Sequence, residues 1–205
     1  YPDATIVDEK TGNTSTATTI AWIWARTVTC PNPACAIEMP LVGSWWLSKN
    51  RGQEAFVVPA VVDDASASSR RRVEFTIGHD KTTGPTGASD GTMSGRSGGI
   101  CVACGSLAPS DHIKSQGMAG GLGASLMAVV AEGNRRRIYV APSDQHRSAS
   151  RVVRPAGVPN QKLGYDPRNL STPAYGLTRF SDLFTDPQMG ALTTIRDLVG
   201  PARET

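Results

Sequence analysis

The chain has 205 residues, of which 39% are hydrophobic and 19% charged, and its net charge is +3 at pH 7. This apolar content can bury a core and excludes wholesale disorder, while 21 glycines and 14 prolines exclude a coiled coil or helical bundle. No apolar stretch approaches the roughly 18 residues that cross a bilayer, and no export signal opens the chain. We therefore expect a soluble, cytoplasmic protein that does not contact a membrane.

The first half of the chain is predicted to be mostly strands. Residues 1–13 are polar and indicate a leader strand or a loose terminus. Ser15 can cap the apolar segment 18–26, for which we expect a short helix running into a strand. Short runs rich in valine and tryptophan then predict strands at 37–42, 45–47, 56–62 and 73–77. Residues 79–99 are rich in glycine, serine and threonine and predict a flexible loop.

The second half combines a hairpin with helical and irregular segments. The apolar runs 126–131 and 138–140, separated by a polar break, predict a β-hairpin, and 143–154 a short polar helix. Residues 155–175 form a proline-rich connector. Thr185 with Gln188 makes a capping box, and apolar residues recur at helical spacing after it, which predicts a C-terminal helix.

These elements predict an α+β fold: a β-rich zinc-ribbon platform with a β-hairpin and a C-terminal helix. We expect three regions within one compact unit. Residues 1–110 hold the zinc ribbon and its loop, 111–154 the hairpin and short helix, and 155–205 the connector and last helix.

The four cysteines carry the strongest chemical signal. They form two close pairs, Cys30 with Cys35 and Cys101 with Cys104, far apart in the sequence. Two short turns that each present two thiolates are what a tetrahedral zinc site requires. Four thiolates leave no open position for water or substrate, so the predicted zinc is structural. Two disulfides or a redox-active dithiol are the alternatives, but the first needs an oxidising compartment and the second needs only one pair.

Arginine dominates the positive charge, with 16 of the 21 basic residues. Six of these arginines form two triplets, which are Arg70, Arg71 and Arg72, and Arg135, Arg136 and Arg137. A planar guanidinium suits phosphate and guanine better than an ammonium does, so the triplets predict contacts with nucleic acid. Solvated charges at strand edges are the alternative.

Other residues that often carry function give weaker signals here. The three histidines, His79, His112 and His146, are scattered and offer neither ligand spacing nor a catalytic triad. The glycine-rich segment 117–123 fits neither a dinucleotide fingerprint nor a P-loop and indicates a flexible entry to the hairpin. The four tryptophans favour a satellite core over base stacking.

Several stretches together resemble a known family. They are residues 22–28, 30–35, 40–41, 46–49, 91–92, 101–105, 126–133, 137–139, 175–177, 182–185 and 191–194. In this order they resemble the zinc-ribbon-containing, adenine-specific DNA methylases, large proteins catalogued around a domain of unknown function. The resemblance covers nearly the whole chain, and it implies that Cys30, Cys35, Cys101 and Cys104 are the zinc ligands.

The resemblance implies a parent enzyme that uses S-adenosylmethionine to methylate the exocyclic amine of adenine in DNA, often in bacterial restriction or phage defence. That chemistry needs a glycine-rich cofactor turn and an Asp/Asn-Pro-Pro-Tyr loop that holds a flipped base. Neither occurs here, since segments 165–168 and 185–188 lack the second proline and the aromatic residue. Because the chain also starts at Tyr1 without a methionine, we expect an internal, non-catalytic fragment of the parent.

Three hypotheses follow for the chain itself. The first is a DNA-recognition insert whose arginine triplets contact phosphates. The second is a structural or protein-docking module that braces the flanking methyltransferase domains, with exposed apolar surface such as Trp45 and Trp46. The third, an independent enzyme, lacks a nucleophile, a paired acid and base and an open metal site in the sequence.

Overall fold

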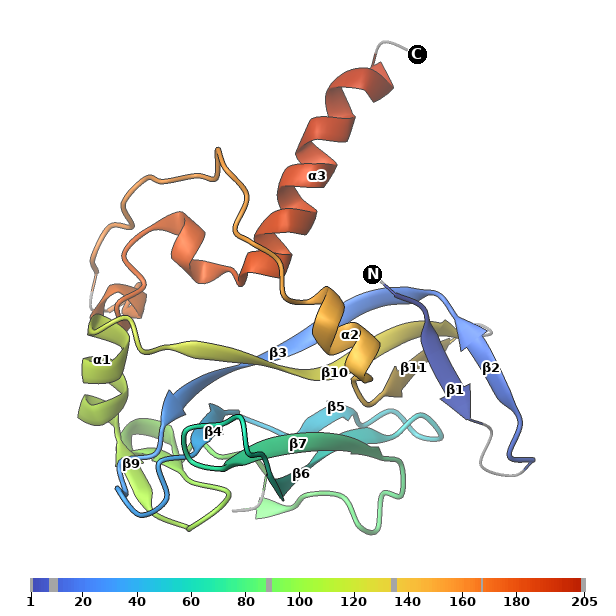
Figure 1. Cartoon of the computed structure of the whole chain (residues 1–205), viewed down its shortest axis with the longest axis horizontal. Helices are drawn as coiled ribbons and strands as arrows, with labels where there is room; N and C mark the ends of the chain where they lie inside the picture. The colour runs from blue at the N-terminus through green and yellow to red at the C-terminus, as the bar shows by residue number, and fades with distance from the viewer. Residues whose placement is uncertain (1, 8–10, 88–89, 134–135, 167, 204–205) are drawn as a thin grey trace.

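The computed structural model describes residues 2–7, 11–87, 90–133, 136–166 and 168–203. Within them the chain folds as a β-rich α+β structure, which confirms the predicted fold class. Its paired strands form antiparallel sheets of four, three, two and two strands (Figure 1).

The four-stranded sheet runs through the middle of the molecule in the order β11-β10-β3-β4. Its strands are β3 (Thr19–Thr29), β4 (Glu38–Leu41), β10 (Gly123–Gly133) and β11 (Arg136–Val140). The long strands β3 and β10 pair from Thr27 with Gly123 to Thr19 with Ala131. The predicted hairpin is confirmed, since β10 and β11 pair from Val129 with Val140 to Gly133 with Arg136.

The expected short helix at 18–26 is wrong, because residues 19–26 belong to β3. The segment is rich in β-branched and aromatic residues, and both of its faces are packed. Ile23 and Ala25 pack in a core that includes Trp45 and Phe75, while Trp22 and Trp24 pack in a second cluster with Leu126 and Val129. The burial of both faces removes the alternating pattern that identifies a half-buried strand.

The three-stranded sheet has the order β5-β6-β7 and packs below the central sheet in Figure 1. Its strands are β5 (Trp46–Ser48), β6 (Ala55–Asp63) and β7 (Arg71–Gly78), close to the predicted runs. Val57 and Phe75 from this sheet, with Met127 and Ala128 from β10, bury the core between the two sheets.

Two small hairpins complete the strands. β1 (Ala4–Val7) pairs with β2 (Thr14–Ala17), so the leader strand is confirmed, and Ser15 lies in a strand rather than capping a helix. β8 (Gly98–Ile100) pairs with β9 (Leu107–Pro109). The loop before β8 is anchored by Thr92, a buried residue whose hydroxyl bonds the carbonyl of Pro40 and the amide of Val42.

Three α-helices lie in the described residues. α1 (Ser110–Met118) has no counterpart in the sequence prediction and ends inside the glycine-rich segment. There Gly117 lies against the backbone of Tyr175, where a Cβ atom would clash with the carbonyl oxygen at 2.1 Å. The short helix α2 (Asp144–Ala149) confirms the polar helix predicted at 143–154.

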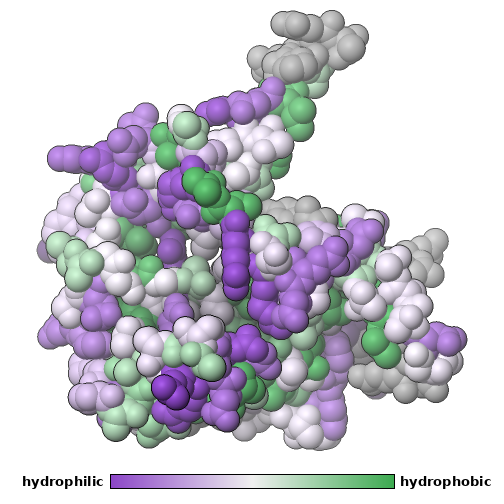
Figure 2. Space-filling view, viewed as in Figure 1, coloured by the Kyte–Doolittle hydropathy of each residue, from purple (hydrophilic) through white to green (hydrophobic). Residues whose placement is uncertain are grey.

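The C-terminal helix α3 (Asp186–Arg203) follows the proline-rich connector and two 3-10 turns, Thr172–Tyr175 and Phe180–Leu183. Its capping box is confirmed: the Thr185 amide donates to Gln188 Oε1 at 2.8 Å, and the Gln188 amide lies 3.4 Å from the Thr185 hydroxyl. The helix projects away from the sheets (Figure 1), and Figure 2 shows hydrophobic residues along it. Met189 is buried, but Ile195 and Leu198 are 62% and 63% exposed.

None of the helices in the described part of the chain is both long enough and apolar enough to span a membrane.

Candidate metal centre and basic surfaces

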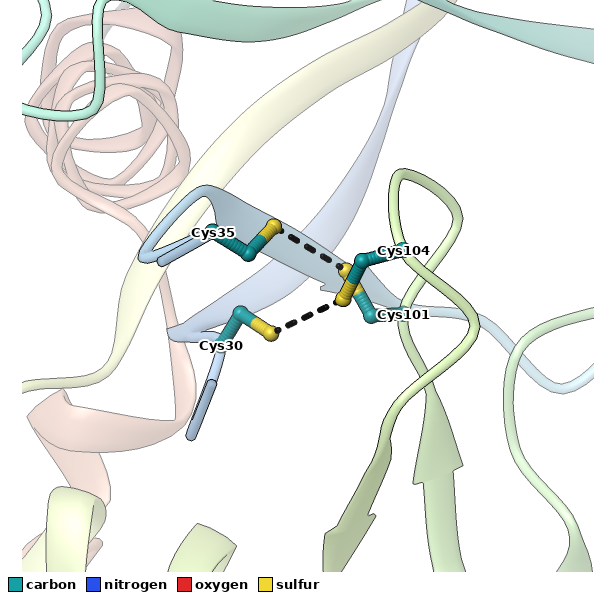
Figure 3. Close-up of side chains that lie close together, drawn as sticks. All are labelled: Cys30, Cys35, Cys101 and Cys104. Atoms are coloured by element: carbon teal, nitrogen blue, oxygen red, sulfur yellow. Dashed lines mark hydrogen bonds between the residues drawn. The ribbon is translucent and has the colours of Figure 1, made fainter. Parts of the chain in front are cut away.

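Each cysteine pair lies in the turn of a β-hairpin. Cys30 follows the end of β3, and Cys35 lies just before β4. Cys101 follows the end of β8, and Cys104 lies three residues before β9. The two hairpins meet so that one turn faces the other across the same edge of the core (Figure 3).

The two turns share a backbone design. In the first, the amides of Cys35 and Ala36 donate to the Asn32 carbonyl at 2.9 Å, and in the second the Gly105 amide donates to the Cys101 carbonyl at 2.9 Å. The residue after the second cysteine is left-handed in both turns, with φ of +45° at Ala36 and +71° at Gly105. This conformation turns the backbone directly after the second cysteine of each pair, and Figure 3 shows the sulfurs of the two turns directed toward one another.

The four sulfurs form a compact cluster in which all Sγ atoms lie within 4.8 Å of one another. Two sulfur contacts cross between the turns, at 3.6 Å from Cys30 to Cys104 and 4.0 Å from Cys35 to Cys101 (Figure 3). Tetrahedral zinc with Zn–S bonds of about 2.3 Å requires sulfurs about 3.8 Å apart. All four cysteines are free thiols, and the donor set therefore fits a metal ion such as zinc.

Burial shapes the electrostatics of the cluster. Cys30, Cys35 and Cys101 are buried, while Cys104 is exposed. Burial raises the pKa of Cys30 to about 12 and also raises the pKa of Cys101. Hydrogen bonds from the Ser106 side chain and amide lower the pKa of Cys104 to about 6. A bound cation would supply the positive charge that the buried thiolates require.

The first arginine triplet lies beside this cluster. Arg71 Nη2 donates a hydrogen bond to Cys35 Sγ at 3.7 Å, so this guanidinium contacts a predicted ligand. Arg72 pairs with Asp64 at 3.4 Å and with Glu74. Arg70 is exposed in the turn between β6 and β7, with a positive φ of 56°. Only Arg70 of this triplet is therefore directed to solvent without an ion pair in the described structure.

The second triplet lies at the other end of the central sheet. Arg136 and Arg137 are exposed on β11 and line a shallow groove of about 640 Å³ with Glu132 and Tyr139. Arg135 lies outside the described residues. Gly123, at one end of β10, pairs with Thr27 near the first cysteine turn, and Gly133, at the other end, pairs with Arg136. The two positions are ten residues apart along the strand, which corresponds to roughly 30 Å. Among the described residues, the structure does not bring Arg136 and Arg137 together with the first triplet.

A larger basic surface was missed by the sequence analysis. A cleft of about 940 Å³ is lined by Arg26, Arg147, Arg151 and Arg154 in addition to Arg71 and Arg72. The first four lie far apart in the sequence, on β3, α2 and the segment after α2, so no local pattern marks them.

The histidines and two of the tryptophans have structural partners. His79 Nδ1 lies 3.1 Å from the Glu54 carbonyl, and His112 Nε2 lies 2.8 Å from the Thr29 carbonyl. The expectation that Trp45 and Trp46 expose apolar surface is wrong for Trp45, while Trp46 is half-buried. Trp45 is only 4% exposed, and Trp46 packs on Phe56 and donates to the Pro85 carbonyl at 2.9 Å.

Comparison of the chain with family models, with curated proteins and with solved structures gives no match.

Proposed function

We propose that this chain is a non-catalytic zinc-ribbon insert of an S-adenosylmethionine-dependent DNA adenine methyltransferase, and that it contributes binding to nucleic acid. The observation that carries the proposal is the cluster of four sulfurs between two facing hairpin turns. The methyltransferase parent rests on the resemblance of the stretches around these cysteines. In this proposal the cofactor and catalytic loop belong to flanking domains of the parent.

The proposed zinc has a structural role. Cys30, Cys35, Cys101 and Cys104 would hold it, and a bound zinc supplies cross-linking of the two hairpins rather than Lewis-acid chemistry on a substrate. Cys30, Cys35 and Cys101 belong to one core cluster with Val28, Ile37 and Met39 from β3, β4 and the turn between them, while Cys104 is exposed. Free thiols at these positions agree with a reducing compartment such as the cytoplasm.

Arginine chemistry supports the nucleic-acid role. The exposed pair Arg136 and Arg137 occupies the outgoing strand of a hairpin, where both guanidinium groups reach solvent. Guanidinium groups contact phosphates through paired hydrogen bonds, and such contacts release counterions from DNA.

The test is an anisotropy titration of the zinc-loaded chain with labelled duplex and single-stranded DNA at two salt concentrations. We expect binding that weakens as salt rises. The double variant R136A/R137A should weaken binding to all sequences alike and reduce the salt slope for duplex by about 0.9 per lost contact. The matched control is K162A/R168A, which removes the same charge from the exposed connector.

No binding at low salt would contradict the nucleic-acid role. It would favour the second candidate, a docking module that braces the flanking methyltransferase domains. The exposed apolar residues of α3, Leu192, Ile195, Leu198 and Val199, favour that candidate. If binding is salt-sensitive but R136A/R137A keeps full affinity, this arginine pair is not part of the interface.

A further inference from the structure

The basic cleft of about 940 Å³ lies between three parts of the chain. One wall is the turn between β6 and β7 with the start of β7, and the floor is the start of β10 beside β3. The other wall is the segment that runs from α2 to residue 154, with the first turn of α3. Figure 2 shows a hollow below the base of α3 with hydrophilic residues at its rim.

The charge of this cleft is strongly biased. Six arginines line it, against the three carboxylates of Glu38, Asp64 and Asp186. Two of these carboxylates are already engaged, since Asp64 pairs with Arg72 at 3.4 Å and Asp186 with Arg154 at 2.7 Å. Glu38 accepts a hydrogen bond from the Thr27 hydroxyl. The remaining arginines therefore leave an excess of positive charge in a concave site, which concentrates anions.

One of the arginines fixes the cleft wall. Arg154 donates from Nε to Asp186 at 2.7 Å, from Nη1 to the Ser181 carbonyl at 2.8 Å and from Nη2 to the Phe184 carbonyl at 3.1 Å. This guanidinium holds the start of α3 against the segment after α2. It is a structural residue of the wall, and its donors are used within the protein.

Other arginines keep donors for a ligand. Arg26 gives one hydrogen bond, from Nη2 to the Asp182 carbonyl at 2.8 Å, and its pKa is lowered by burial and by the charge of Arg154. Arg151 is exposed and pairs with no carboxylate of the described chain. Arg147 pairs only with Asp144, at 3.2 Å, and the Asp144 side chain is 99% exposed, so solvent screens this pair.

The floor and size of the cleft favour an extended ligand. Residues 123–126 of β10 line the cleft. In the described structure these residues pair with β3 along one edge, whereas β11 pairs only with residues 129–133, so the other edge of 123–126 has no neighbouring strand. Trp24, which is half-buried, also lines the cleft and offers an aromatic surface. The volume of about 940 Å³ lies at the upper end of ligand pockets, which hold about 300–1,000 Å³.

We infer that this cleft binds one strand of nucleic acid, with its phosphates on Arg26, Arg147 and Arg151 and a base against Trp24. A basic groove with an aromatic platform is the arrangement by which proteins hold single strands. The inference rests on the proposed nucleic-acid role and replaces the arginine triplets as its main contact surface. The half-buried Arg71 connects the cleft to the cysteine cluster through its hydrogen bond to Cys35.

The test is the anisotropy of the zinc-loaded chain with labelled oligo-dT and with a duplex of equal length. R147A/R151A should weaken oligo-dT binding at least tenfold at low salt and reduce the salt slope by about 1.4, since each single-strand contact contributes about 0.7. Neither residue supports the cleft wall as Arg154 does, and unchanged thermal unfolding would confirm that the variant is folded. K162A/R168A should change affinity less than twofold.

The outcomes separate the inference from the proposed function. The assignment of binding to the cleft would be overturned if R147A/R151A and K162A/R168A weakened binding equally, or if only R136A/R137A weakened it. Either result would leave the nucleic-acid role intact. Absence of binding to either DNA would overturn both. Competition by polyglutamate as strong as that by unlabelled oligo-dT, at equal charge, would overturn the assignment to nucleic acid and indicate an acidic peptide. Stronger binding to duplex than to oligo-dT would overturn the inference that the ligand is a single strand.

Discussion

The residues that follow Cys35 and Cys104 decide the shape of the two turns. Ala36 and Gly105 both adopt left-handed backbone conformations, but only glycine does so without a steric cost. The first turn therefore stores strain that the second turn avoids. Its amide hydrogen bonds to the Asn32 carbonyl hold Ala36 in this conformation.

This asymmetry predicts opposite effects of two substitutions. A36G should stabilise the zinc-loaded chain by about 0.5–1 kcal/mol, and G105A should destabilise it by about 1 kcal/mol, because the change in left-handed backbone strain exceeds the opposing change in the entropy of the unfolded chain. A Cβ atom at Gly105 would meet nothing within 4 Å, which excludes a clash. Urea unfolding measures both. G164A is the control, since Gly164 also has open space but no positive φ. Equal stability of G105A and the wild type would contradict the strain argument.

At the residue scale, the spacing of the cysteines predicted that all four come together, because two closely spaced pairs can form few kinds of site in a folded chain. The role of Arg71 could not be predicted in this way. A triplet suggests a shared surface, yet on β7 successive side chains point to opposite faces, so Arg71 contacts Cys35 while Arg72 pairs with acidic residues. The cleft arginines escaped prediction because the fold alone brings them together.

At the element scale, prediction succeeded where one local signal dominated. The capping box at Thr185 and Gln188 marked α3, and the polar break after 131 marked the β10–β11 hairpin. The helix α1 was missed because its N-cap residue, Pro109, makes no side-chain hydrogen bond to the helix, and only Ile113 and Gly117 of the helix are buried. The contact of α1 with residues around Tyr175 provides packing that no local pattern shows.

The helix α2 carries a pH-sensitive contact. His146 is 2% exposed and packs edge-on against Trp22, and its Nδ1 accepts a hydrogen bond from the Ser143 amide at 3.2 Å. Burial lowers the pKa of His146 below its usual 6.5. As pH falls below about 6.5 the unfolded chain takes up a proton that the folded chain resists, so the free energy of unfolding decreases with falling pH.

We therefore expect H146Q to be less sensitive to acid than the wild type between pH 7.5 and 5.5, although it loses stability at pH 7.5. Urea unfolding at three pH values measures the difference between the two proteins. H79Q, which changes an exposed histidine, serves as the control and should follow the wild type. The prediction fails if H146Q and the wild type lose the same free energy over this range.

At the scale of the whole molecule, the sheets and the cysteine cluster depend on one another. The cluster holds two hairpins that are separated by more than sixty residues of sequence, and three of its cysteines, Cys30, Cys35 and Cys101, pack in a core with Met39, Ala108 and Ile113. The same region lines part of the basic cleft, through Ala36 and Arg71. Metal binding at the cysteines would therefore set the geometry of both the core and the proposed ligand site.

Native mass spectrometry of the chain determines whether the four cysteines bind one zinc ion. We predict one zinc per chain, lost together with the folded charge-state distribution after chelation, and absent from C101S, while S110A retains it. A chain that is folded without zinc, or that carries two disulfides in place of free thiols, would contradict the account.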